Sequence, residues 1–101
     1  MKELGKFLKD SRKKKNFTLR EVSKRLQSLY ENDRRYWISD SHLCWLEQGK
    51  TDLPNPFVLM GLAIVYDVSY HVLYQLAGYE PASEEEYEYT NPNGLLQKYL
   101  N

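Results

Sequence analysis

The chain has 101 residues, of which 42% are hydrophobic and 28% are charged, which is the size and composition of one globular domain. No apolar run approaches the roughly 20 residues that a membrane-spanning helix needs, and the first residues lack the apolar core of a signal peptide. A single cysteine, Cys44, excludes an internal disulfide and is typical of a reducing cytoplasm. We therefore expect a cytoplasmic protein without a membrane-spanning helix.

Charge is distributed unevenly, although the net charge is zero. Residues 1–50 contain 13 basic and 7 acidic side chains, whereas residues 51–101 contain 1 basic and 7 acidic side chains. A basic half on a small domain predicts a surface that faces a polyanion, either nucleic acid or an anionic membrane. A charged face that is merely solvated is the alternative.

Apolar residues in the first half recur at helical spacing and outline two helices. The first helix has one apolar face, formed by Leu4, Phe7, Leu8 and the stem of Arg12. It ends near Asn16, because asparagine tolerates the left-handed conformation at a helix C-terminus. Thr18 is suited to cap the second helix, with Glu21 as its capping-box partner. The inward residues of the second helix are Val22, Leu26 and either Leu29 or Tyr30.

Three further helices follow a polar segment. Residues 31–36 lack clear periodicity, so they are predicted to form a helix end and an exposed loop. Ser39 caps a short third helix that is closed by Gly49. Pro56 begins a fourth helix, which is apolar nearly all round and is therefore expected to be central. Ser69 caps a fifth helix, whose inward residues are Val72, Leu73 and Leu76.

These elements predict an all-α domain over residues 1–80 and an acidic tail over residues 81–101. A last short helix is expected after Asn91. Its apolar side is formed by Leu95, Leu96, Tyr99 and Leu100. Because a helix of about ten residues is marginal alone in water, this side packs either on a second copy of the chain or on its own domain. We expect the second copy, and therefore a homodimer.

Two stretches of the chain contain linked patterns. In residues 18–26, Thr18 is followed three positions later by Glu21, and then by the apolar Val22 and the small Ser23. Residues 38–51 begin with an apolar–serine pair, Ile38 and Ser39. Two apolar residues three positions apart follow, Leu43 and Leu46, and after them come Glu47 and, two positions later, Gly49. Together with Pro54 and the helices predicted after it, these patterns resemble the phage-repressor-type (Cro-like, XRE) helix-turn-helix family over about residues 3–79. The resemblance implies a five-helix lambda-repressor-like domain that binds DNA.

In this family the third helix lies in the major groove of DNA, while the second crosses the backbone. The family's base-contacting positions are occupied here by Asp40, Ser41, His42 and Trp45. Ser41 and His42 can each donate or accept at a base edge, although His42 is alternatively a plain surface histidine. Asp40 can only accept, which suits a cytosine amine. Trp45 is unusual at its position, and it either contacts thymine methyls and sugars or packs against the segment before the third helix.

Phosphate contacts in the family come from the start of the second helix and from the turn after the third. Those positions are occupied here by Thr18, Arg20, Gln48, Lys50 and Thr51. Leu19 departs from the family, which often has a phosphate-binding glutamine there. Arg12 and Glu47 resemble the family's buried ion pair, which ties the first helix to the end of the third. The alternative is an exposed arginine and a solvated glutamate.

The largest departure from the family is an insertion of about ten residues between the second and third helices. This insertion, residues 27–37, contains two arginines beside two aromatic residues, namely Arg34, Arg35, Tyr36 and Trp37. It either forms a wing that reaches the DNA backbone or minor groove, or closes the core with its rings while the arginines face water. We expect a mixed arrangement, with Trp37 packed and both arginines near phosphate.

The sequence offers no arrangement that is typical of catalysis. His42 and His71 have no ligand-like spacing with Cys44, and no nucleophile or phosphate-loop motif occurs. We therefore expect no enzymatic activity, no metal and no cofactor. The sequence predicts a sequence-specific transcriptional regulator, a repressor, that binds double-stranded DNA as a dimer. The alternative is an interaction module, such as an antitoxin-like protein, that binds a protein partner through its acidic C-terminal half.

Overall fold

The structure is a computed structural model that describes residues 2–50 and 54–79. This part of the chain contains five α-helices and one short 3-10 helix, and no β-strand. The elements are α1 (Lys2–Lys14), α2 (Leu19–Leu29), η1 (Arg34–Tyr36), α3 (Asp40–Glu47), α4 (Pro56–Tyr66) and α5 (Tyr70–Leu76). The all-α prediction is confirmed over these residues.

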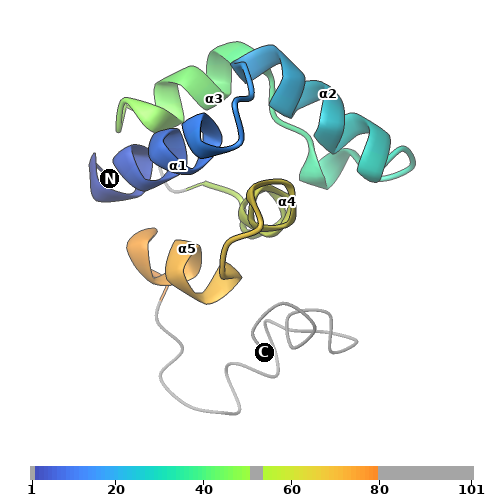
Figure 1. The fold of residues 1–101 in the computed structure, drawn as a ribbon. Helices are drawn as coiled ribbons and strands as arrows, with labels where there is room; N and C mark the ends of the chain where they lie inside the picture. Colours follow the sequence, from blue (N-terminus) through green and yellow to red (C-terminus); the bar gives the residue numbers. More distant parts are fainter. Residues whose placement is uncertain (1, 51–53, 80–101) are drawn as a thin grey trace, which may run out of the picture.

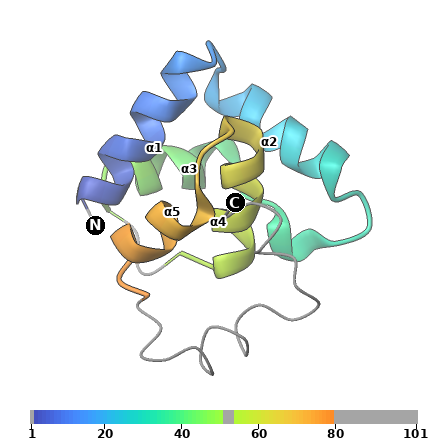
Figure 2. The same ribbon diagram turned by 60° about the horizontal axis from the view of Figure 1, so that its bottom comes forward.

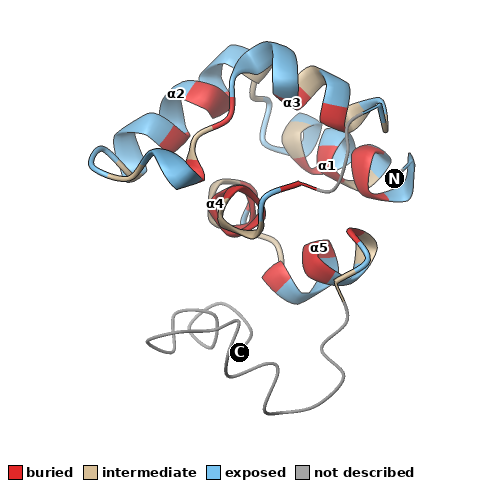
Figure 3. Ribbon diagram, turned by 180° about the vertical axis from the view of Figure 1, so that it is seen from behind, coloured by how far each residue is buried: buried red, intermediate tan, exposed pale blue. Residues whose placement is uncertain are grey.

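Helix α4 lies at the centre of the fold, with α1, α2 and α3 on one side and α5 on the other (Figure 1). A second view shows α4 and α5 in front of α3, with α1 and α2 at either side (Figure 2). Seven of the 11 residues of α4 are buried, which confirms the prediction of a central helix. The outer sides of α2 and α3 are mostly exposed (Figure 3).

Local sequence signals set the boundary between α1 and α2. Asn16 has a φ of 59°, which is the left-handed conformation predicted for it. The Thr18 hydroxyl accepts a hydrogen bond from the Glu21 backbone at 3.1 Å, and the Thr18 backbone donates to the Glu21 carboxylate at 3.1 Å. These two bonds form the predicted capping box. The hydrogen bond from the Thr18 backbone lowers the pKa of Glu21.

The later helices begin at polar caps. The Ser39 side chain accepts from the backbone N–H of His42 at 3.1 Å, and Gly49 closes α3 with a φ of 72°. Asn55 caps α4 through its side-chain oxygen. Ser69 occupies the N-cap position of α5, but its side chain makes no cap hydrogen bond. Ser69 therefore lies at the predicted position, but the prediction that its side chain caps the helix is wrong.

The inward face of α5 differs from the predicted one. Leu73 is fully buried as expected, but Val72 is 36% exposed and Leu76 is only partly buried. Tyr70 and Tyr74 are buried instead, with ring centroids 5.4 Å apart. The prediction failed because it followed aliphatic side chains, whereas α5 covers α4 with tyrosine rings.

The insertion, residues 27–37, folds back onto α4 through η1. Tyr36 is 6% exposed, because its ring stacks on Tyr30 at 3.8 Å and meets the edge of Phe57 at 5.3 Å. The prediction of an exposed loop is therefore wrong at Tyr36. Leu29 is 55% exposed and Tyr30 packs against the core, so Tyr30 continues the inward stripe of α2.

Helices α1 and α3 approach each other closely at Gly5. A Cβ atom there would meet the carbonyl oxygen of Glu47 and would lie 2.7 Å from that of Leu46. Both obstacles are backbone atoms, which cannot move aside as a flexible side chain can. Glycine at this position therefore permits the contact that places α3.

Several predictions fall outside the described residues. They concern Thr51, the acidic tail over residues 81–101 and the short helix expected within it after Asn91. Among the described helices, none combines the length and the apolar character that crossing a membrane requires.

Candidate nucleic-acid interface

A buried ion pair joins α1 to the end of α3, the helix predicted to contact bases. Arg12 Nε donates to Glu47 Oε2 at 2.7 Å, and Arg12 Nη2 donates to Glu47 Oε1 at 2.9 Å. The third nitrogen, Nη1, donates to the carbonyl oxygen of Phe17 at 2.9 Å. The two charged side chains are 13% and 5% exposed, so the alternative of an exposed pair is excluded. The hydrogen bond to Glu47 raises the pKa of Arg12.

A buried hydrogen bond fixes the segment that leads into α3. Ser23 Oγ on α2 donates to the carbonyl oxygen of Ile38 at 2.7 Å, and both residues are buried. Sequence reasoning treated Ser23 only as a small residue and missed this bond. The available signal was a hydroxyl on the inward face of an amphipathic helix, because buried hydroxyls need hydrogen-bond partners.

Helix α3 has one buried and one exposed side. Its buried residues are Leu43 and Leu46. The four residues predicted to contact bases, Asp40, Ser41, His42 and Trp45, are all exposed. Asp40 Oδ1 also accepts from the backbone N–H of Ser41 at 2.8 Å, which places a carboxylate at the positive end of the helix dipole. The structure therefore presents all four candidate side chains to solvent on one short helix.

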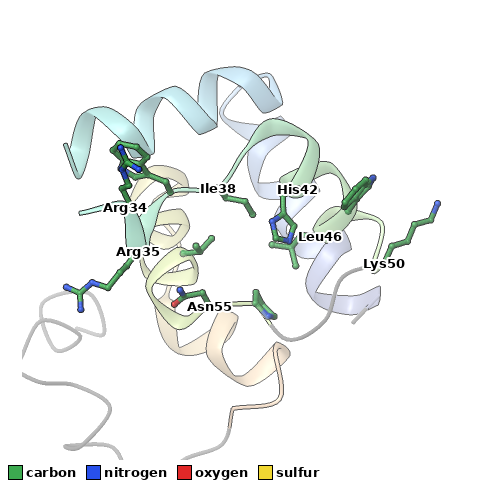
Figure 4. A pocket seen from close by; sticks show the side chains of 11 residues that line it. Arg34, Arg35, Ile38, His42, Leu46, Lys50 and Asn55 are labelled. Atoms are coloured by element: carbon green, nitrogen blue, oxygen red, sulfur yellow. The ribbon is translucent and has the colours of Figure 1, made fainter. Parts of the chain in front are cut away.

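A groove with a volume of about 600 Å³ lies beside this exposed side. It is lined by residues of the insertion, of α3, of the segment after α3 and of the start of α4. Its basic side chains are Arg34, Arg35, His42 and Lys50, and its tryptophans are Trp37 and Trp45. Figure 4 shows His42 on α3 between the two arginines on one side and Lys50 on the other. Basic side chains clustered on one face are the electrostatic footprint of a nucleic-acid site.

The insertion combines a packed tryptophan, as predicted for Trp37, with exposed arginines. Trp37 is half-buried, and its indole N–H donates to the Tyr30 carbonyl oxygen at 2.9 Å. The Arg34 guanidinium lies 5.6 Å from the centre of the Trp37 ring. Arg35 Nη2 lies 2.6 Å from Asp33 Oδ2, and this contact lowers the pKa of Asp33. Arg34 and Arg35 therefore stand exposed at the groove, with the charge of Arg35 partly balanced.

Trp45 does not pack into the insertion. Its side chain is 57% exposed although it lines the same groove as Trp37. Its ring lies edge-on to the ring of His42, with centroids 6.4 Å apart. Packing of Trp45 against the insertion does not fit this exposure, and its contact with thymine methyls and sugars stays a prediction.

The residues predicted to contact phosphate occupy two places. Thr18 and Arg20 are exposed at the start of α2 and are not part of the groove lining. The Thr18 oxygen accepts from Glu21, which leaves its own proton free to be donated. Gln48 and Lys50 are exposed after α3, and the Gln48 amide donates to the Cys44 sulfur at 3.2 Å. Leu19, which departs from the family pattern, packs against the core.

No family model, curated protein or solved structure matches this chain. Within the described residues, no three His, Cys, Asp or Glu side chains are grouped so that they could hold a metal ion. The candidate interface consists of the exposed side of α3 and the basic groove beside it.

Proposed function

We propose that this chain is a sequence-specific transcriptional regulator, a repressor, that binds double-stranded DNA through a lambda-repressor-like domain. The main support is one observation: α3 exposes four side chains able to contact bases directly beside a groove lined by basic residues and tryptophans. The major groove of B-DNA is about 12 Å wide and admits an α-helix. The length and the exposed side of α3 suit this position.

The candidate residues divide into two classes in this proposal, those that contact bases and those that contact the backbone. Ser41 and His42 donate or accept at base edges, and Asp40 accepts from a cytosine amine. Trp45 contacts thymine methyls and sugars. The backbone of the duplex is contacted by the remaining candidates, Thr18, Arg20, Arg34, Arg35, Gln48, Lys50 and Thr51. Phosphate contacts fix the register of the protein, and base contacts supply the specificity.

The small size of the domain supports a dimer. A single small DNA-binding module buries roughly 600–1,000 Å² of protein surface, which is at the low end for specific binding. Two copies on one duplex double this area and match two half-sites about one helical turn apart. We therefore propose that the repressor acts as a homodimer.

A salt titration of binding to random-sequence duplex DNA tests this proposal. We expect the logarithm of the affinity to fall linearly with the logarithm of the salt concentration, by about 0.9 for each phosphate neutralised. Three or more phosphate contacts then give a slope of about −3 or steeper. A DNA affinity that is absent, or that does not change with salt, would contradict the proposal and would favour the alternative of a protein-interaction module.

A further inference from the structure

The last described residue contacts one residue of the groove lining through its side chain. Tyr79, the last described residue, donates its phenolic O–H to the carbonyl oxygen of Pro54 at 3.0 Å. Pro54 itself lines the groove. The Tyr79 ring also stacks on Tyr74, with centroids 4.8 Å apart. These contacts fix the point from which residues 80–101 continue.

The first ten residues of this tail are acidic. Residues 80–89 contain five glutamates and no basic residue. The glutamates are Glu80, Glu84, Glu85, Glu86 and Glu88, and two tyrosines, Tyr87 and Tyr89, lie among them. Ten residues span up to about 33–36 Å when extended, so the segment is long enough to reach across the groove from Tyr79.

Charge and ring chemistry in the groove complement this segment. Arg34 and Lys50 are exposed cations on the groove lining, and Arg35 lies next to Arg34. Carboxylates accept hydrogen bonds from the same arginine and lysine donors that bind phosphate. Tyrosine rings are also able to stack on the exposed face of Trp45, as bases and sugars of DNA are.

We propose that, in the absence of DNA, residues 80–89 dock in the groove of their own chain and compete with DNA phosphates for its cations. The effect on DNA binding rests on the proposed function, whereas the docking itself does not. Random DNA offers the groove mainly phosphates, which the glutamates imitate, but a specific site adds base contacts with α3 that the tail cannot replace. Displacing the tail costs the same free energy on either kind of DNA, so the tail weakens both affinities by the same factor and the specific site keeps the higher affinity.

The expected size of the effect follows from tethering. A short flexible tether gives a local concentration of the order of millimolar. A segment with an affinity of a few tenths of a millimolar for the groove then weakens binding to random DNA by about three- to tenfold. The competition fades as salt rises, because the Debye length falls from about 10 Å at 0.1 M to about 3 Å at 1 M.

Docking is measured without DNA by zero-length carbodiimide cross-linking of the full chain, which joins carboxylates to lysine amines in contact. An equal mixture of isotopically light and heavy protein separates links within one chain from links between chains. We expect the glutamates of residues 80–89 to join Lys50 of the same chain, in several-fold excess over Lys13, an exposed lysine on α1. Equal yields at the two lysines, or as many mixed light–heavy links as unmixed ones, would overturn the proposal.

Competition is measured with a tail of unchanged length in which Glu84, Glu85, Glu86 and Glu88 are replaced by glutamine. We expect this variant to bind random duplex DNA about three- to tenfold more tightly at low salt. In a background with Arg34→Gln and Lys50→Gln, the same change should give less than a twofold gain. Unchanged affinity of this four-glutamine variant for random DNA would overturn the competition. If the chain bound no DNA at all, the proposed function would fail, while the cross-links would still decide whether the tail docks.

Discussion

Arg12 and Glu47, which are 35 positions apart in the sequence, form a two-point hydrogen-bonded ion pair that joins α1 to the end of α3. A carboxylate in the last turn of a helix is disfavoured by the helix dipole, and the guanidinium of Arg12 offsets this cost. Because Arg12 also binds the carbonyl oxygen before α2, the pair relates three helices to one another. The exposed side of α3 is thereby held at a fixed angle.

Removing either partner should destabilise the fold strongly. We expect Arg12→Ala and Glu47→Ala each to lower the free energy of unfolding by about 3–5 kcal/mol, because a buried charge loses its partner. The double variant should lose much less than the sum of the two. Urea unfolding of the four proteins measures this coupling, with Lys9→Ala on the exposed side of α1 as a control. Strict additivity would mean that the two side chains do not interact.

Tyr66 predicts how stability depends on pH. Its hydroxyl is buried and has no hydrogen-bond partner within the described part of the chain. Burial raises the pKa of Tyr66 above its ordinary value of 10.0, so the hydroxyl ionises more readily in the unfolded chain. Stability should therefore fall as pH rises above about 10.

Replacement of Tyr66 by phenylalanine removes both the unpaired hydroxyl and its ionisation in alkali. We expect Tyr66→Phe to raise the free energy of unfolding at neutral pH by about 1 kcal/mol, because an unpaired polar group leaves the core. The loss of stability in alkali should also become shallower, with a remainder due to Tyr70, whose pKa is raised by burial too. Chemical unfolding at pH 7 and above pH 10 measures both changes. A less stable variant with an unchanged alkaline profile would contradict the assignment.

Phosphate contacts should be independent of sequence. We expect Lys50→Ala and Arg20→Ala each to weaken binding to all duplexes alike and to make the salt slope shallower by about one. Lys9→Ala, which changes an exposed lysine on α1 outside the proposed contacts, is the matched control. If neither slope changes, these residues do not contact phosphate.

The end of the tail should be needed for dimerisation. Removal of residues 91–101 deletes the predicted apolar side with Leu95 and Leu96 but keeps the acidic residues 80–89. We expect the truncated chain to sediment as a monomer and to lose its preference for a fixed half-site spacing. Retention of the parent mass and of that preference would place the dimer contact elsewhere.

Features that depend on neighbouring residues could be predicted from the sequence. The capping box of Thr18 and the left-handed turn at Asn16 act over a few residues, so their residue types suffice. The exposed positions of α3 follow from helical periodicity once Leu43 and Leu46 are assigned to the core. The partner of Arg12 came from the family resemblance rather than from local spacing.

Features that join distant segments could not be predicted in this way. Tyr36 is buried because Tyr30 and Phe57 enclose its ring, and residue 57 lies beyond the whole of α3. The groove likewise exists only because the insertion, α3 and the start of α4 meet in space. Periodicity describes one helix at a time and contains no information about contacts between distant segments.

Selection of bound duplexes from a random library tests most directly whether α3 reads DNA. The full chain should enrich a two-part sequence with half-site centres about 10–10.5 base pairs apart, or a multiple of that spacing. Ser41→Ala and His42→Ala should each relax the preference at one position, by about 1–3 kcal/mol there, and leave the other positions unchanged. Failure to enrich any sequence, or equal weakening by these variants on every sequence, would contradict the assignment of α3 as the reading helix.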